Sequence, residues 1–322
     1  MFSRRTLLAA AGAAALPLPA LAQAWPARPI RLVVPFAPGG TTDIVARIVG
    51  QAMQERLGQP VIVDNRPGAG ATTASQAVAD AAPDGYTLVV SNSASHGISP
   101  SLFRNVRYNA VTDFSHIALI ATTSNAAIVN PSYPAQTIQA LIALARSRPD
   151  GLDYAMSGFG TTTHLLGARF GMALGVRMNP VAYRGSGPAL ADLVAGTVGL
   201  MFDGLPSSIP FIREGRVRAL AVADATRNRF LPDVPTFAEA GMPQIISSSW
   251  FGVSGPRGMD PALVARLNAA IRAILALPTV QERWTSLTAN IPDLTPEQYV
   301  AFITDELRVW GEVVRATGAT AE

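Results

Sequence analysis

The sequence predicts an α/β protein made of two lobes, each a sheet flanked by helices. Three observations support this prediction. Apolar runs of strand length alternate with stretches of helical periodicity over most of the chain. The length of 322 residues, with 49% hydrophobic content, is enough for about two domains. The alternation begins anew after residue 125, and strand-like crossings near residues 122–125 and 222–226 would join the two units as a clamshell.

We therefore expect residues 25–124 with 225–322 to form lobe 1, and residues 125–224 to form lobe 2. Lobe 1 begins with a buried strand at 30–36, followed by a helix at 41–58 whose apolar residues share one face and which Gly58 can end. Strands separated by helices of this length form a parallel sheet with right-handed crossovers. Further strands are expected at 60–65, 86–92, 126–130, 152–157, 178–183, 198–204, 217–224 and 249–256, and further helices at 137–149, 160–175, 185–196, 260–276, 278–287 and 295–317.

The first 24 residues are typical of an export signal. Arg4 and Arg5 form a basic start, a short apolar stretch runs from Leu7 to about Leu16, and two Ala-x-Ala cleavage sites end at Ala22 and Ala24. The stretch is too short and too rich in alanine for a stable membrane span. We expect a cleavable signal at 1–24 and a soluble mature protein in the periplasm. The paired arginines leave twin-arginine and Sec export equally open.

The composition excludes several classes of function. The signal carries two of the 25 basic residues and none of the 22 acidic ones, so the mature chain is nearly neutral and we expect no nucleic acid partner. The chain has no cysteine, which excludes disulfides and thiol chemistry, and no lysine, which excludes Schiff bases and the Walker A motif. Gly68-Ala69-Gly70 and Gly158-Phe159-Gly160 lack the third glycine of a dinucleotide site. We expect no cofactor and no metal.

Three turns carry the most chemical information. PFAPGGTTD (35–43), SNSASHG (91–97) and MSGFGTTTH (156–164) each place small residues and hydroxyls where a strand ends and a helix begins. Ligands of α/β sheets bind at that edge, and a helix N-terminus offers unpaired N–H groups and a partial positive charge. The turns therefore predict a site for a small anion. Taken singly, each is also compatible with an ordinary helix cap.

These turns, in this order, resemble those of the substrate-binding proteins of tripartite tricarboxylate transporters, the Bug family of extracytoplasmic solute receptors. The resemblance implies a type II periplasmic-binding-protein fold that closes like a flytrap on a small organic acid or amino acid. It also implies delivery of that ligand to a membrane permease with a large and a small subunit. It rests on the stretches RLVVPFAPGGTTDIVAR, VIVDNRPGAGA, APDGYTLV, SGFGTTTHL, PVAYRGSGPALADLVAGTVGLMFD and RALAVADATRNRFLPDVPTFAEAG.

The resemblance also implies which residues bind the ligand, because the family holds carboxylates through backbone groups and bridging waters of two loops. Asp203 matches the aspartate that borders the family's site; from the residues alone, it could equally cap a helix. Ser91 and Asn92 follow the third strand and are expected to line the same cleft. The chain departs from the family at Thr72 and Thr73, where a further glycine is common. The matching loop residues are Phe36, Ala37, Gly39, Gly40 and Thr41 in lobe 1, and Ser157, Thr161 and Thr162 in lobe 2.

Two other functions remain open. A receptor of the same fold could signal to a membrane partner instead of a permease. An exported hydrolase would need a base beside a nucleophile, for which His164 with Ser157 or Thr161 is the only candidate cluster. We expect no enzyme, since the histidines are few and unpartnered; His116 is expected at a surface or strand end. Arg184 could face the distal end of the ligand or pack beside the cleft.

Overall fold

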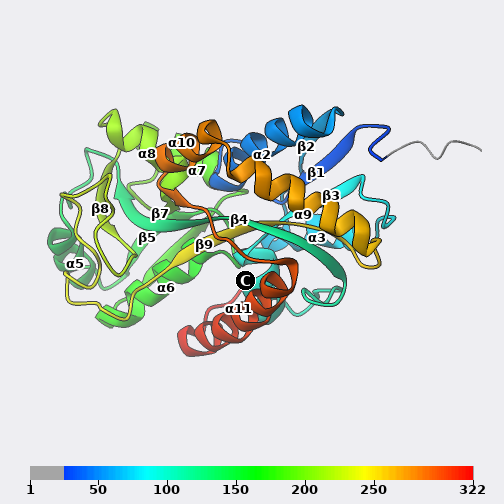
Figure 1. The fold of residues 1–322 in the computed structure, drawn as a ribbon. Helices are drawn as coiled ribbons and strands as arrows, with labels where there is room; N and C mark the ends of the chain where they lie inside the picture. Colours follow the sequence, from blue (N-terminus) through cyan, green and yellow to red (C-terminus); the bar gives the residue numbers. More distant parts are fainter. Residues whose placement is uncertain (1–24, 322) are drawn as a thin grey trace, which may run out of the picture.

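The computed structural model describes residues 25–321; the predicted export signal lies outside the described residues. Two lobes lie side by side. The long strand β4 (Phe114–Val129) belongs to the sheets of both lobes, and β9 (Ser248–Pro256) pairs with its first part near the middle of the molecule (Figure 1). The remaining elements of lobe 1 are β1 (Ile30–Val34), α2 (Thr41–Leu57), β2 (Val61–Asn65), η1 (Ala69–Ala71), α3 (Thr72–Ala79), β3 (Thr87–Asn92), η2 (Ala94–Ile98), α4 (Ser99–Leu102), α9 (Pro261–Leu275), α10 (Pro278–Ser286), β10 (Ala289–Asn290) and α11 (Pro296–Thr317).

The sheet of lobe 1 has a parallel part and an antiparallel part. Strand β1 pairs in parallel with β2 and β3, so that Leu32 lies between Val63 and Leu88. Strand β9 then runs antiparallel to β3 and to the first part of β4. Helices α2 and α9 bury apolar residues such as Val45 and Ile271 in one core with this sheet. Apolar burial of this extent fixes where β1 ends and α2 begins, which is where the first glycine-rich turn lies.

Lobe 2 repeats the layered arrangement. The second part of β4 pairs antiparallel with β7 and β8, while β5 runs parallel to β6 and β7. Helices α5 and α6 pack in one core with Phe202, and α7 and α8 pack in the other with Met201, because successive residues of a strand point to opposite faces. The elements are α5 (Ile138–Arg146), β5 (Leu152–Met156), α6 (Thr162–Leu174), β6 (Met178–Ala182), α7 (Ser186–Ala195), β7 (Leu200–Gly204), α8 (Leu205–Arg213) and β8 (Arg218–Val222).

The two crossings between the lobes differ from the predicted ones in detail. The first is a single strand, β4, which pairs with β9 as far as Ser124 and with β7 and β8 from there onward. The second comes later than the predicted 222–226. The segment between β8 and β9 places Phe237, Met242 and Ile245 in a core of lobe 2, so the chain re-enters lobe 1 only at β9.

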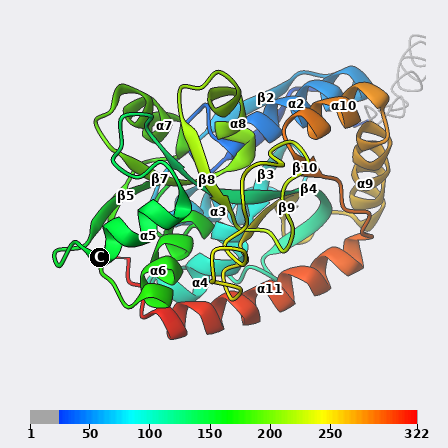
Figure 2. The same ribbon diagram turned by 90° about the vertical axis from the view of Figure 1, so that its left-hand side faces the viewer.

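The C-terminal helix α11 runs along one side of both lobes (Figure 2). Its residue Glu306 accepts hydrogen bonds from the indole N–H groups of Trp250 on β9 (2.6 Å) and Trp310 (2.7 Å), which fixes the helix to lobe 1. Further along, Trp310 packs in one cluster with Ile98 of lobe 1 and Leu165 of lobe 2. Helix α11 therefore contacts both lobes in this arrangement.

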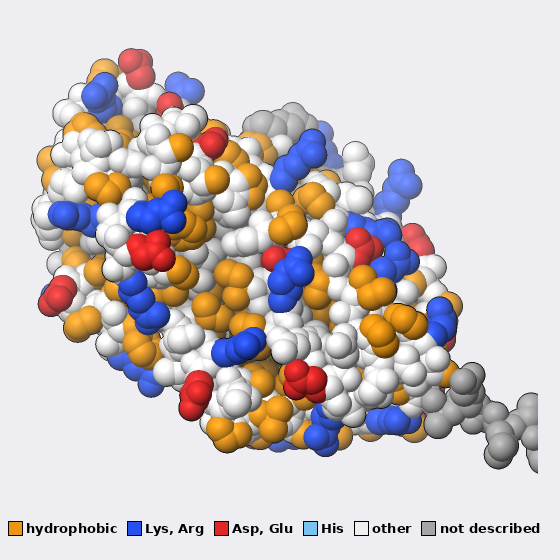
Figure 3. Space-filling view, turned by 90° about the horizontal axis from the view of Figure 1, so that it is seen from above, with side chains coloured by type: hydrophobic (Ala, Val, Ile, Leu, Met, Phe, Trp, Pro, Cys, Tyr) orange, Lys and Arg blue, Asp and Glu red, His pale blue; other side chains and the backbone are white. Residues whose placement is uncertain are grey.

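Within residues 25–321, no single helix is both long and apolar enough to cross a membrane; the bent pair α9 and α10 meets the length and composition criteria only when taken together. On the face drawn in Figure 3, arginine side chains are scattered among acidic and apolar ones and do not gather into one large patch.

Candidate ligand-binding site

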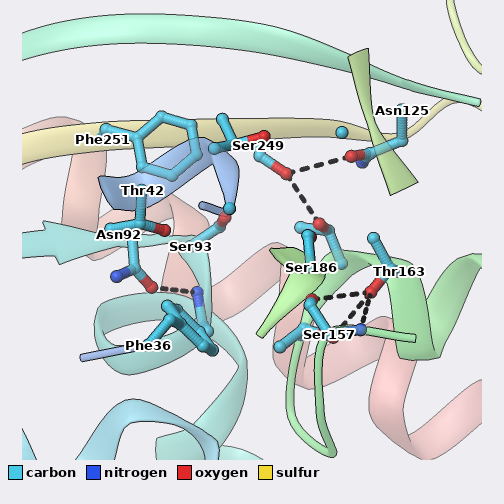
Figure 4. Close-up of a pocket in the computed structure, with 16 residues that line it drawn as sticks. Phe36, Thr42, Asn92, Ser93, Asn125, Ser157, Thr163, Ser186, Ser249 and Phe251 are labelled. Carbon is cyan, nitrogen blue, oxygen red and sulfur yellow. Dashed lines mark hydrogen bonds between the residues drawn. The ribbon is translucent and has the colours of Figure 1, made fainter. Parts of the chain in front are cut away.

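A cavity of about 40 Å³ lies between the lobes, at the edge where strands end and helices begin (Figure 4). Lobe 1 contributes the turns after β1 and β3, lobe 2 contributes the turns after β5, β6 and β7, and strands β4 and β9 contribute Asn125, Ser249 and Phe251. The lining residues are Phe36, Gly40, Thr41, Thr42, Asn92, Ser93, Ala94, Asn125, Ser157, Thr161, Thr162, Thr163, Ser186, Gly204, Ser249 and Phe251.

Helix N-termini from both lobes meet at this cavity. Helices α2, α7 and α8 begin after Gly40, Gly185 and Gly204, and no side chain within the described residues caps any of the three. The first N–H groups of a helix have no partner inside the helix and carry a partial positive charge. None of the 16 lining residues is charged. The site therefore offers an anion neutral hydrogen-bond donors and helix dipoles rather than a cationic side chain.

The side chain of Asp43 stabilises the turn after β1 in lobe 1. Its carboxylate accepts hydrogen bonds from the Gly39 N–H (3.0 Å), Arg47 Nε (2.9 Å) and Asn65 Nδ2 (3.0 Å), and the same Asn65 amide donates to the Phe36 carbonyl (2.9 Å). Burial alone would raise the pKa of Asp43, but the hydrogen bonds from Arg47, Gly39 and Asn65 outweigh it and lower the pKa. The charged carboxylate thus fixes the backbone that faces the cavity.

Replacing Asp43 by asparagine is expected to loosen this turn. The amide keeps the size but offers one acceptor oxygen, so the Gly39 or Asn65 hydrogen bond is lost. We expect the free energy of unfolding to fall by about 2 kcal/mol and ligand affinity to fall about tenfold, measured by urea unfolding and calorimetry. Arg47→Gln is the control: it removes the half-exposed guanidinium that pairs with Asp43 and Asn65 but leaves the carboxylate with its hydrogen bonds from Gly39 and Asn65, so it should cost less, about 0.5 kcal/mol. Equal effects of the two changes would contradict this role for Asp43.

The turn in lobe 2 is ordered by its own hydroxyls. Thr161 caps α6 by accepting the His164 N–H (3.2 Å), and its hydroxyl donates to the Gly158 carbonyl (2.6 Å). The hydroxyls of Ser157 and Thr163 lie 2.9 Å apart. Thr162 reaches across the cavity to Ser249 on β9, with 2.7 Å between their hydroxyl oxygens. Hydroxyl and backbone groups therefore surround the cavity on the side of lobe 2.

Asp203 lies behind the cavity rather than in its wall. It is fully buried and accepts hydrogen bonds from Ser186 Oγ (2.5 Å) and Ser207 Oγ (2.7 Å). Ser207 also contacts Thr41 of lobe 1, with 2.9 Å between the two hydroxyl oxygens. Burial raises the pKa of Asp203 to about 6, although the serine hydroxyls and the Gly204 N–H lower it. Asp203 thus positions Ser186, which lines the cavity, and Ser207, which contacts the other lobe.

The lobes are closed on one another, and glycines make the contact possible. The Ala37 N–H of lobe 1 donates to the Arg184 carbonyl of lobe 2 (2.8 Å). A Cβ atom at Gly187 would lie 2.2 Å from the Pro38 carbonyl oxygen, and one at Gly40 would lie 3.2 Å from the Ser186 nitrogen. Only glycine permits such close approach of two backbones. The loop after β1 and the start of α7 therefore form a closure contact beside the cavity.

The structure brings seven of the sequence-predicted residues to the cavity: Phe36, Gly40, Thr41, Asn92, Ser157, Thr161 and Thr162. Ala37 and Gly39 lie instead in the closure contact. Ser91 points into the core of lobe 1, where its hydroxyl oxygen lies 2.8 Å from both Ser254 Oγ and Tyr299 Oη. Asp203 supports the wall from behind, as described above.

Sequence reasoning missed several lining residues. Thr42, Ser93, Ala94 and Thr163 are buried and lie one or two residues after predicted ones, and their place at the start of α2, η2 and α6 could have been recognised. Ser186 begins α7 after a glycine, which is also a recognisable signal. Asn125, Gly204, Ser249 and Phe251 lie on or beside the strands that cross between lobes, where no local motif marks them.

The cluster of His164 with Ser157 or Thr161 that a hydrolase would need is not formed within the described residues. The ring of His164 is buried, contacts Phe159 edge-on and makes no hydrogen bond with Ser157 or Thr161. His116, expected at a surface, is buried in β4 because β9 and α11 cover it, and its Nδ1 lies 2.9 Å from Ser254 Oγ. In the same part of the chain, no group of three or more His, Cys, Asp or Glu residues could hold a metal ion.

Two α/β lobes, two connecting strands and a cavity between helix N-termini define a two-lobed binding protein of the periplasmic-binding-protein class. The profile of the tripartite tricarboxylate transporter family receptor matches residues 45–319. The chain belongs to this family.

Relatives in sequence and in structure agree with that membership. Protein BugT of Bordetella pertussis is 38% identical over 313 residues, which are 97% of this chain and 95% of BugT. The structure of MatC (Rpa3494) from Rhodopseudomonas palustris with bound malate is 36% identical, covers 90% of this chain and 100% of MatC, and has a TM-score of 0.86. Rpa4515 of R. palustris with adipate is 36% identical, covers 91% and 98%, and has a TM-score of 0.88.

Proposed function

We propose that this protein is a periplasmic receptor that binds a small carboxylate by closure of its lobes and delivers it to a tripartite tricarboxylate-type permease. The ligand carboxylate lies between the start of α2 in lobe 1 and the start of α6 in lobe 2. The start of α7 completes the site. The backbone N–H groups of Gly40 and Thr41, and those of Thr162 and Thr163 at the start of α6, are the main donors, because the Thr161 hydroxyl already donates to the Gly158 carbonyl. No cofactor or metal takes part.

One observation carries this proposal: helix N-termini from two different lobes, most of them uncapped, converge on one uncharged cavity. A carboxylate accepts several charge-assisted hydrogen bonds at once, and such bonds are about twice as strong as neutral ones. Because the donors come from both lobes, the ligand binds the closed state better than the open one and shifts the equilibrium toward closure. An affinity near micromolar, about −8 kcal/mol, is sufficient for uptake.

A thermal-shift screen with calorimetric follow-up tests the proposal. Dicarboxylates, amino acids and aromatic acids are compared with their uncharged amides. At a ligand concentration of 100 times the dissociation constant, the stabilisation is about 2.7 kcal/mol, so we expect a rise in Tm of about 5 °C for the best acid and none for its amide. A folded protein that no acid stabilises, or that amides stabilise equally, would contradict carboxylate binding.

Three further measurements separate the alternatives. Mass spectrometry of the bound acid after long incubation should show it unchanged, whereas a product would support the hydrolase. Deletion of the gene should abolish uptake of the labelled acid if the partner is a permease, and should leave uptake intact if the receptor is a sensor. Fractionation of the expressing cells should place the protein in the periplasm, cleaved within the predicted signal at 1–24.

A further inference from the structure

The start of helix α6, which lines the cavity on one side, contacts lobe 1 on its other side. Thr162 and Thr163, the first two residues of the helix, line the cavity. Leu165 follows Thr163 by two positions, and a rotation of about 100° per residue places these two side chains on nearly opposite sides of the helix. Leu165 is fully buried and packs in one cluster with Ile98 and Trp310 of lobe 1. One helical turn thus faces both the cavity and the opposite lobe.

The burial of Leu165 depends on lobe 1. The next residue, Leu166, packs in a core of lobe 2, whereas Leu165 belongs to neither hydrophobic core of that lobe. The other buried members of its cluster are Ile98 of η2 and Trp310 and Val314 of α11, all of which come from lobe 1. Separation of the lobes would therefore expose Leu165 and the Trp310 ring to water, which is unfavourable.

The Trp310 ring is fixed in place by lobe 1. Its indole N–H donates to Glu306 (2.7 Å), whose carboxylate also accepts the indole N–H of Trp250 on β9 (2.6 Å). A Cβ atom at Gly97 would lie 2.9 Å from Cδ1 of Trp310, so the ring lies directly against the backbone of η2. Helix α6 passes beside α11 at this point (Figure 2). Trp310 is therefore a fixed apolar surface that Leu165 contacts when the lobes are closed.

A second contact between the lobes lies at the turn before α6. A Cβ atom at Gly160 of lobe 2 would lie 2.6 Å from the Ser99 hydroxyl oxygen and 2.7 Å from the Phe103 ring, both of lobe 1. The Ser99 hydroxyl is itself held by donating to the Gly70 carbonyl (2.7 Å). None of these residues, and none of the cluster around Leu165, lines the cavity. These contacts between the lobes therefore need no ligand.

We propose that the contact of Leu165 with Trp310, which we name the latch, holds the lobes closed in the unliganded protein and positions the start of α6 for the carboxylate. The latch goes beyond the proposed function, which requires closure but does not say what favours it before a ligand binds. Because closed lobes cover the cavity, the ligand enters during brief openings of the latch. Association is then slower than diffusion allows, and the free energy of closure weakens the affinity only slightly. Leu165 and Trp310 are thus positioning residues for binding.

Small-angle scattering without any ligand tests the latch directly. We expect the radius of gyration of the unliganded wild type to equal that of the closed structure. Leu165→Ala should lower the ratio of closed to open protein about thirtyfold and so increase the radius of gyration. Leu166→Ala is the matched control, because the same change one residue later lies within lobe 2; it should reduce the free energy of unfolding and leave the radius of gyration unchanged. Leu165→Met, which restores an apolar side chain of similar volume, should scatter like the wild type.

Binding kinetics provide a readout that a merely structural role would not change in this way. For a wild type with about a tenfold excess of closed over open protein, Leu165→Ala should associate about eightfold faster and yet bind about fourfold more weakly. Stopped-flow fluorescence measures the rates and calorimetry the affinities, both with the acid that stabilises the wild type most in the thermal-shift screen. This arm alone rests on the proposed function.

Two results would overturn the latch while the proposed function stands. One is an unliganded wild type whose radius of gyration is clearly larger than that of the closed structure; this measurement decides even if an alanine variant fails to fold. The other is a Leu165→Ala protein that scatters and binds as Leu166→Ala does. Absence of binding by every acid would overturn the proposed function, and the scattering of the unliganded proteins would still test the latch.

Discussion

Replacement of Gly187 by valine is expected to weaken ligand binding by at least about a hundredfold, equal to about 2.7 kcal/mol, while each lobe stays folded. A Cβ at this position would lie 2.2 Å from the Pro38 carbonyl oxygen and 3.3 Å from the Gly39 Cα. The obstructing atoms are backbone atoms of the other lobe, so they cannot rotate away and the lobes must move apart. The donors of α2 and α6 then no longer reach the same carboxylate.

The control for this variant is Ala191→Val, which adds a β-branched residue to the exposed side of the same helix. In helix propensity, Ala191→Val should lose a few tenths of a kcal/mol and Gly187→Val should gain a similar amount, so propensity cannot explain weaker binding by the Gly187 variant. Calorimetry gives the affinities, and small-angle scattering with ligand present reports whether the lobes close. If Gly187→Val binds the ligand as tightly as Ala191→Val does, closure is not needed for binding and the two-lobed mechanism fails.

The second large effect is a loss of stability between pH 7 and pH 5, caused by buried histidines. Burial lowers the pKa of His96 well below its usual value, and the adjacent His116 lowers it further; burial lowers the pKa of His116 and His164 to about 4. The unfolded chain, with a histidine pKa near 6.5, takes up protons first as the pH falls. Each of the last two histidines therefore costs about 2 kcal/mol of stability at pH 5, and the loss levels off below pH 4.

Buried acids act in the opposite direction. Burial raises the pKa of Asp203 to about 6, and it also raises the pKa of Asp224 and Glu306. The folded state of these groups binds protons more readily than the unfolded state, so their contribution to stability increases as the pH falls; for Asp203 the gain from pH 7 to pH 5 is about 1 kcal/mol. The histidine contribution must therefore be isolated by mutation.

Urea unfolding of the wild type and of His116→Gln, at pH 7 and at pH 5, isolates the contribution of His116 to the pH dependence of stability. Glutamine can still contact Ser254, which lies 2.9 Å from the His116 ring, but it does not titrate in this range. Between pH 7 and pH 5 the wild type should lose about 2 kcal/mol more than the variant. Parallel pH dependence of the two proteins would show that His116 is not held in its neutral form by burial.

The parts of the site that could be predicted from sequence are those with local causes. Gly40, Thr41, Thr161 and Thr162 stand where a buried strand meets a helix, and their turn chemistry is visible in a few neighbouring residues. The two-lobed fold could be predicted for the same reason, because the alternation of strands and helices is visible in local hydrophobic patterns. The order of the turns along the chain indicated the family. The similarity to BugT confirms that family resemblance.

The parts that could not be predicted depend on contacts distant in sequence. Ser91 and Asn92 were both expected in the cleft, but consecutive strand residues point to opposite sides; Asn92 lines the cavity and Ser91 contacts Tyr299 in the core. Asp203 is enclosed by Ser186 and Ser207, which requires knowing how α7 and α8 pack.

The central claim is that donors of both lobes hold one carboxylate without a cationic side chain at the cavity. A crystal structure with the acid that raises Tm most in the screen tests it most directly. We predict a carboxylate within hydrogen-bond distance of the first backbone N–H groups of both α2 and α6. A ligand bound by one lobe alone, or a carboxylate held only by arginine outside the cavity, would contradict it.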